Sequence, residues 1–168
     1  WRDWSSDVCS SDLFDMETFK NSENFLVPYC ICFNIKKNFF NFYYEDDLNI
    51  IEKSIEFIFN NIKKDIIFYI HNIQFDGVII IDFLSKKNYI FDVLLKNNNI
   101  YYIKIIKEKK IIIFKCSYKI LPYSLKKISR DFNTLSKMIF PYKFSSYSNL
   151  NYIGNIPDSI YFNSENDY

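Results

Sequence analysis

The spacing of hydrophobic and polar residues changes several times along the chain, and each change predicts a different element. Residues 25–35 and 38–44 are rich in β-branched and aromatic side chains, which predicts two strands. Only a pair of lysines separates them, so we expect an antiparallel hairpin. Over 47–64 the apolar residues recur at helical spacing, which predicts a helix with Asp47 as its N-cap.

The pattern continues to alternate between strands and helices. Residues 65–72 form a short apolar run that predicts a buried strand, and 75–87 predicts a helix because its large apolar residues cannot all face one side of a strand. Two or three strands are expected over 89–117 and a short helix over 124–133, whereas 140–157 has turn residues and no clean period. This order predicts an α/β fold with helices packed on a mixed sheet.

The composition supports a strand-rich core and argues against several classes of protein. Ile, Phe, Tyr, Asn and Lys dominate and alanine is absent, a bias typical of AT-rich coding sequence. The net charge is +1, so no overall positive field indicates a nucleic-acid partner. Four cysteines without a C-x-x-C pair and a single histidine argue against a zinc site. No apolar run is long enough for a membrane span.

Residues 1–13 differ from the rest of the chain and are predicted to be a non-native tail. Both tryptophans lie here, SSD occurs twice, and Ile, Asn, Lys, Phe and Tyr are missing. The string resembles a translated sequencing adapter joined to a reading frame; the alternative is a disordered native tail. A signal peptide is not indicated, because the apolar h-region is missing. We expect the main domain over 14–133 and an irregular segment over 134–168.

Three carboxylates stand where a metal site could form. Asp15 and Glu17 are two residues apart on a predicted strand, which places both on one face. Asp76 follows the buried strand and starts a helix, at the end of the sheet where ligands usually bind, and Gly77 would allow a close approach. Carboxylates without a His or Cys cluster favour Mg²⁺ or Mn²⁺. The structural alternatives are a solvated strand edge for the first two acids and a helix cap for Asp76.

Two polar residues precede Asp76 and add to this candidate site. His71 alone is more often a packed or hydrogen-bonded histidine than a catalyst, and Asn72 is typical of a turn that closes a strand. Taken without a family likeness, these residues leave a metal site and purely structural roles equally open.

Two short segments, "FDMETF" (14–19) and "HNIQFDG" (71–77), contain a D-x-E and an N-x-x-x-F-D pattern. They resemble the first and second motifs of the 3′–5′ proofreading exonuclease domain of family B DNA polymerases, most closely the protein-primed branch of phages and linear mitochondrial plasmids. "CSYKILPYSLKKISRDFN" (116–133) and "FPYKFSSYSNLNYIGNIP" (140–157) are similar to later segments. The likeness covers residues 14–162, with the motifs in the correct order, and implies a ribonuclease-H-like α/β fold.

The resemblance implies a role for individual residues. Asp15, Glu17 and Asp76 would be catalytic carboxylates that hold Mg²⁺ or Mn²⁺. Lys127 would lie near the scissile phosphate, although a solvated helix face is the alternative for either lysine of the pair. The residues expected to contact the 3′ end of single-stranded DNA are Thr18, Asn72, Phe75, Ser117, Tyr118 and Lys126. Phe75 has a place in the core as its alternative role.

The chain also departs from the family pattern. The third motif, Y-x-x-x-D, is not found, since "YFNSE" (161–165) ends in glutamate and comes too early. We therefore interpret the chain as part of a longer polymerase, truncated at both ends, and expect weak or no nuclease activity. The full enzyme would also bind primer–template DNA, deoxynucleotides and a terminal protein, without a membrane. A mitochondrial linear plasmid is the expected source, and a virus the alternative.

Two other functions stay open at this point. The chain could be a catalytically incompetent module that binds single-stranded nucleic acid on a ribonuclease-H-like scaffold. It could also be a stand-alone exoribonuclease with similar acidic motifs, although "LPYSLKKISRDFN" and "NLNYIGNIP" argue against that function.

Overall fold

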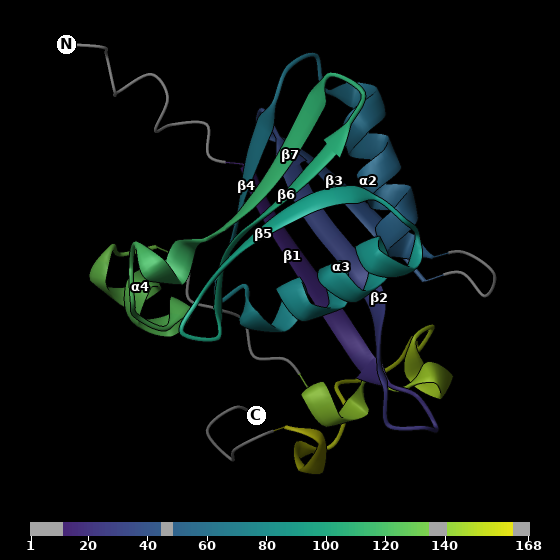
Figure 1. Cartoon of the computed structure of the whole chain (residues 1–168). Coiled ribbons are helices and arrows are strands. Elements are labelled where there is room, and N and C mark those ends of the chain that lie inside the picture. The colour runs from purple at the N-terminus through teal and green to yellow at the C-terminus, as the bar shows by residue number, and fades with distance from the viewer. Residues whose placement is uncertain (1–11, 45–48, 135–140, 163–168) are drawn as a thin grey trace. The chain divides into compact units, whose positions relative to one another are not determined.

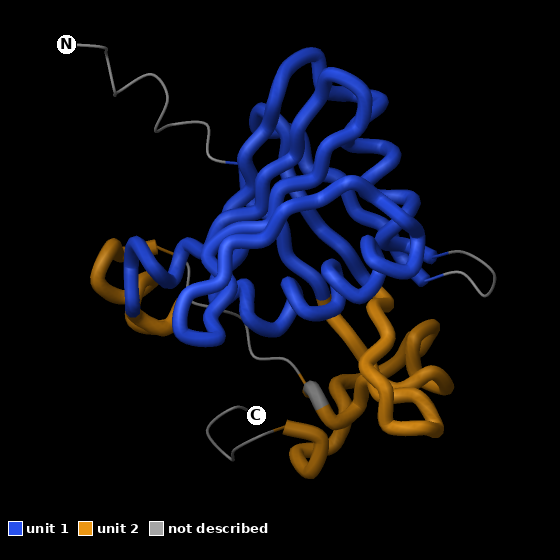
Figure 2. Tube along the Cα trace, viewed as in Figure 1, with its two compact units in different colours: residues 1–16, 30–122 blue, residues 17–29, 123–168 orange. Residues whose placement is uncertain are grey.

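The computed structural model of the chain describes residues 12–44, 49–134 and 141–162 (Figure 1). The chain divides into two compact units. The first contains residues 1–16 and 30–122, and the second contains 17–29 and 123–168 (Figure 2). The helices of the described segments include none that is long and apolar enough to cross a membrane.

The strands of the described segments form one mixed, seven-stranded sheet in the order β3-β2-β1-β4-β7-β6-β5. β4 runs parallel to both β1 and β7, whereas β2–β3, β5–β6 and β6–β7 are antiparallel pairs. The predicted α/β class with a mixed sheet is therefore confirmed. The strands are β1 (Asp12–Lys20), β2 (Leu26–Ile35), β3 (Asn38–Tyr43), β4 (Ile66–Ile70), β5 (Ile90–Lys96), β6 (Asn99–Lys107) and β7 (Lys110–Cys116).

Two of the hairpins turn through residues with positive φ. Lys36 and Lys37 have φ values of 50° and 72°, and Asn97 and Asn98 have values of 50° and 58°. Two-residue turns with both φ values positive match the twist of the flanking strands. The predicted hairpin at the lysine pair is confirmed, and Asp12 supports it because its Oδ1 accepts a hydrogen bond from the Lys36 N–H at 2.9 Å.

Helices accompany the sheet, and the α-helices of the described segments are α2 (Ile50–Asn61), α3 (Gln74–Lys86) and α4 (Leu125–Asp131). The N-cap of α2 is Asn49, whose side chain accepts hydrogen bonds from the N–H groups of Ile51 and Glu52. The predicted cap at Asp47 is therefore wrong, and Asp47 itself lies outside the described residues. One short 3-10 turn, η1 (Ser117–Lys119), follows β7. The described residues of the predicted irregular region contain 3-10 turns as their only helical elements, which are η2 (Tyr142–Phe144), η3 (Tyr147–Asn149) and η4 (Ser159–Tyr161).

α2 and α3 share one hydrophobic core with one face of the sheet. Phe68 of β4 and Phe114 of β7 are fully buried at its centre, and their rings stack at 5.7 Å between centroids. Each helix contributes an apolar stripe, including Ile55 and Ile58 from α2 and Leu84 from α3. This shared core holds the start of α3 rigidly against the sheet.

The first strand begins earlier than the predicted domain boundary. Asp12 and Leu13 pair with Phe68 and Tyr69 of β4, so the last two residues of the predicted tail take part in the sheet. The other residues of that tail lie outside the described part of the chain.

Candidate functional site

The parallel strands β4 and β7 end at the same edge of the sheet, where β1 passes beside β4, and several predicted site residues lie there. Asp15 and His71 each come two residues after the Leu13–Tyr69 pair of β1 and β4. Ser117 directly follows Cys116, which pairs with Ile70 at the end of β4. Ligands of α/β sheets bind at this edge because the loops that follow parallel strands converge there.

A hydrogen-bonded pair joins the ends of β4 and β7. Ser117 Oγ donates to the carbonyl oxygen of Ile70 at 3.4 Å and lies 3.2 Å from Nδ1 of His71. The ring of Tyr118 meets the His71 ring edge-on, with 5.6 Å between centroids. His71 is thus a hydrogen-bonded histidine, as its structural alternative predicted. Nothing in the sequence predicted its pairing with Ser117, which lies 46 residues away.

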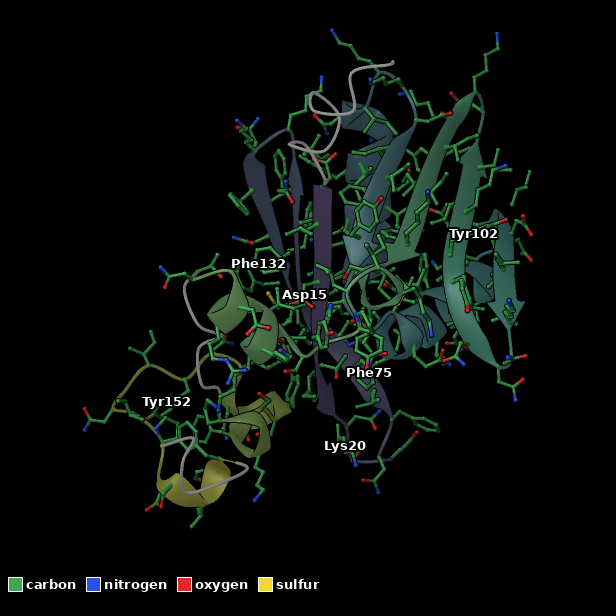
Figure 3. All side chains as sticks on the ribbon, turned by 90° about the vertical axis from the view of Figure 1, so that its left-hand side faces the viewer. Asp15, Lys20, Phe75, Tyr102, Phe132 and Tyr152 are labelled. Carbon is green, nitrogen blue, oxygen red and sulfur yellow. The ribbon has the colours of Figure 1, made fainter. Side chains whose placement is uncertain are left out.

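Asn72 is exposed in the turn that leads into α3. Phe75, labelled in Figure 3, is exposed at the start of that helix. Asn72 has a φ of 58°, a left-handed conformation that asparagine tolerates better than most residues. Phe75 is 45% exposed in the first turn of α3, so its alternative role as a core residue is wrong. Its ring is available for stacking.

Asp76 lies in the first turn of α3 and is only 6% exposed. The N-cap of this helix is Ile73, so the alternative in which Asp76 caps the helix is wrong. The N-terminal end of a helix nevertheless favours a nearby negative charge. The start of α3 is anchored because Gln74 Oε1 accepts a hydrogen bond from the Ile100 N–H at 3.1 Å.

Gly77 has a packing role next to Asp76. A Cβ atom at this position would lie 2.9 Å from Cδ1 of Ile100 and 3.3 Å from Cδ1 of Ile103. Glycine therefore lets α3 approach β6. The close approach that Gly77 allows in the structure is this helix–sheet contact.

The three predicted metal-ligand carboxylates are divided between the two units of the chain. Among the described residues, no three His, Cys, Asp or Glu side chains lie close enough together to hold a metal ion. Asp15 and Asp76 belong to the first unit and Glu17 to the second, and each of the three takes part in further interactions. Their oxygen donors suit a hard cation chemically, and their role as metal ligands stays a prediction.

The remaining predicted residues, Glu17, Thr18 and the lysine pair, belong to the second unit. Glu17 and Thr18 are half-buried on β1. Every second residue of this strand is buried up to Met16, but the next buried residue is Phe19, so the buried side of the strand changes at Glu17 and Thr18. In α4, Lys127 Nζ is bonded to Asp131 Oδ2 at 2.6 Å and lies 4.7 Å from the centre of the Tyr123 ring.

An open hollow of about 480 Å³ is lined by residues of α4 and of the segment that follows it. Every residue that lines it is polar or basic, and none of these lining residues is acidic. The lining residues are Ser124, Lys126, Lys127, Ser129, Arg130, Asn133 and Thr134. Sequence reasoning named the two lysines but missed Arg130, which lies one helical turn after Lys126, and Asn133, which lies beyond the C-terminal end of α4.

The sheet and its helices have the fold of a domain of DNA polymerases. Phi29 DNA polymerase complexed with single-stranded DNA matches with a TM-score of 0.58 and 20% identity, over 75% of this chain and 24% of that chain. Its ternary complex with primer-template DNA and incoming nucleotides matches with the same TM-score, over 76% of this chain. The predicted ribonuclease-H-like class of fold is confirmed.

The family follows from the sequence. The model of the family described as DNA polymerase type B, organellar and viral, matches residues 55–168, so the chain belongs to this family. A probable DNA polymerase of Agaricus bitorquis is 39% identical over 75 residues, which are 43% of this chain and 9% of that protein. The family predicted from the motifs is confirmed, and the chain spans only a small part of this relative's length.

Proposed function

We propose that the chain carries the 3′–5′ exonuclease region of its polymerase and acts on single-stranded DNA ends. The observation that supports this most is the register of β1 and β4. It places Asp15 level with the end of β4, after which Asn72 and the first turn of α3 with Asp76 follow. The segments around these three residues resemble family B exonuclease motifs. The substrate class is supported by the Phi29 enzyme of the same fold, which was solved with single-stranded DNA.

The exposed groups at this edge suit an unpaired 3′ end. Phe75 and the 37% exposed Tyr118 can stack on bases, since stacking accepts any base. Asn72 and Ser117 supply polar contacts beside them, and Thr18 would contact the same strand. Such contacts hold a strand without reading its sequence.

Asp15, Glu17 and Asp76 would hold Mg²⁺ or Mn²⁺. When bound, such ions would supply activation of a water molecule and stabilisation of the departing 3′ oxygen of a phosphodiester. Lys127 would offset charge on the scissile phosphate, which requires its ammonium group to exchange Asp131 for that phosphate.

Cleavage of 3′-labelled single-stranded DNA with Mn²⁺ tests the proposal. The present chain should cleave weakly or not at all, and a version extended along the reading frame should cleave at a rate that Asp76→Asn lowers at least about 100-fold. Asp65→Asn is the matched control, because an asparagine oxygen still accepts the Ile111 N–H bond that Asp65 accepts at 3.0 Å. Equal cleavage by the extended protein and both variants would disprove the role of Asp76.

The second candidate is a module that binds single-stranded nucleic acid without turnover. It requires only exposed groups such as Phe75 and Tyr118, on which bases can stack, and no metal ligands. Tight strand binding with no metal-dependent cleavage, even in the extended version, would select this function.

The remaining proposals concern the full-length polymerase. We expect primer–template DNA, deoxynucleotides and a terminal protein as its partners, and a mitochondrial linear plasmid as its source, with a virus as the alternative.

A further inference from the structure

The hollow at α4 carries positive charge that the described structure leaves unneutralised. Lys126, Lys127 and Arg130 all line it. Lys127 is bonded to Asp131, whereas Arg130 reaches the same carboxylate only at 3.5 Å and is 76% exposed. Lys126 is exposed, and its ammonium group has no hydrogen-bond or ion-pair partner among the described residues. Two cationic groups are therefore available to a ligand.

The hydroxyl groups of the hollow are already used within the chain. Ser129 Oγ donates to the carbonyl oxygen of Lys126 at 3.0 Å, and Thr134 Oγ1 donates to that of Ser129 at 3.4 Å. Ser124 Oγ accepts the Lys127 N–H bond that caps the helix. The cationic donors left for a ligand are the Lys126 ammonium and the Arg130 guanidinium, which suit an anionic oxygen.

We infer that this hollow binds backbone phosphate of a single DNA strand through Lys126 and Arg130. A volume of about 480 Å³ accepts a phosphate with its sugar, and an open rim lets a strand pass through. Both cations contact phosphate oxygen, which every nucleotide carries, so binding is independent of base sequence and of metal. The identity of the strand as DNA rests on the proposed function. Lys126 would bind backbone phosphate, whereas Lys127 would act at the scissile phosphate.

Fluorescence anisotropy of a 5′-labelled oligothymidylate with the full chain, in EDTA and over a series of salt concentrations, tests this assignment. Each phosphate contact to a single strand contributes about 0.7 to the slope of log affinity against log salt. Lys126→Gln and Arg130→Gln should each lower the slope by about that amount and weaken binding equally for thymidylate and mixed-sequence strands. Circular dichroism checks that each variant is folded.

Lys64→Gln is the matched control, because Lys64 is exposed, has no partner in the described structure and carries the same charge. Slopes of Lys126→Gln and Arg130→Gln that equal the control slope would overturn the assignment. The assignment would also be overturned if inorganic phosphate displaced the strand at a concentration equal to that of the strand's own phosphate groups. That result would indicate a site for small anions. If the salt slope depends on Lys126 while the extended protein shows no cleavage, the phosphate-binding role of the hollow is supported and the proposed exonuclease activity is disproved.

Discussion

The two edges of the first unit's sheet differ in how their polar groups are used. At the edge where β4 and β7 begin, Glu56 accepts hydrogen bonds from Tyr89 and Lys107, and Lys110 Nζ donates to the carbonyl oxygen of Phe59. At the opposite edge, Asn72 is exposed and has no bonded partner within the described ranges. We expect the paired groups to stabilise the fold at the first edge and the available groups to serve binding at the second.

The pKa values at the paired edge reflect its hydrogen bonds. Those from Lys107 and Tyr89 hold the pKa of Glu56 below its usual value of 4.5. Burial, helped by the hydrogen bond to Glu56 and by its charge, raises the pKa of Tyr89, so the phenol stays a donor at neutral pH. The charged form of Glu56 and the neutral form of Tyr89 therefore support each other.

The largest expected effect comes from the core that supports both edges. Phe68→Ala should cost about 3–5 kcal/mol of unfolding free energy, because Phe68 is fully buried and its removal leaves a cavity. Urea denaturation followed by circular dichroism measures this loss. DNA binding should fall in parallel; intact binding in an unfolded variant would contradict the common support of the two edges.

The next effect separates binding from stability at Asn72. Asn72→Ala should cost about 1 kcal/mol, because alanine is strained at a φ of 58°. Asn72→Gly removes the amide without that strain and should be as stable as the parent chain. Both variants should bind single-stranded DNA more weakly in anisotropy titrations. Weakening by the alanine variant alone would assign Asn72 a purely structural turn role.

The paired edge should show the reverse behaviour. Glu56→Gln should lower stability by about 1 kcal/mol, since its carboxylate is partly exposed and the ion pair is screened by solvent. DNA binding should not change. A thermal melt gives the first quantity and an anisotropy titration the second, and a binding defect equal to that of Asn72→Gly would remove the distinction between the edges.

The pH dependence of stability sharpens the same comparison. The pKa of Glu56 is lowered on folding, so its contribution is present above its usual value of 4.5 and is lost as pH falls through the folded pKa. Stability curves of the parent chain and of Glu56→Gln should therefore converge in acid. Curves that stay parallel from neutral to acidic pH would show that the charge of Glu56 contributes nothing.

The smallest effect is expected at Asp12. Burial raises its pKa, so the contribution of its protonated form is present below its usual value of 3.8 and is lost as pH rises through the folded pKa. Asp12→Asn keeps an oxygen for the Lys36 N–H and removes the buried charge. A gain of a few tenths of a kcal/mol is expected at neutral pH in urea denaturation, and a clear loss would show that the charge itself is needed.

Local sequence patterns determined much of this protein. The lysine and asparagine turns, the helix over 75–87 and the family motifs could be predicted because each depends on neighbouring residues. The helix start at Asn49 could not, since Asp47 and Asn49 are both good caps and packing of the first turn selects between them.

Only the tertiary structure decided how the candidate groups are used. It pairs Ser117 with His71 across two strands, packs Gly77 against β6, and bonds Lys127 to Asp131 while Lys126 stays available. Adjacent lysines are equivalent in a sequence pattern. They become different when a helix turns one of them towards a carboxylate one turn away and directs the other to solvent.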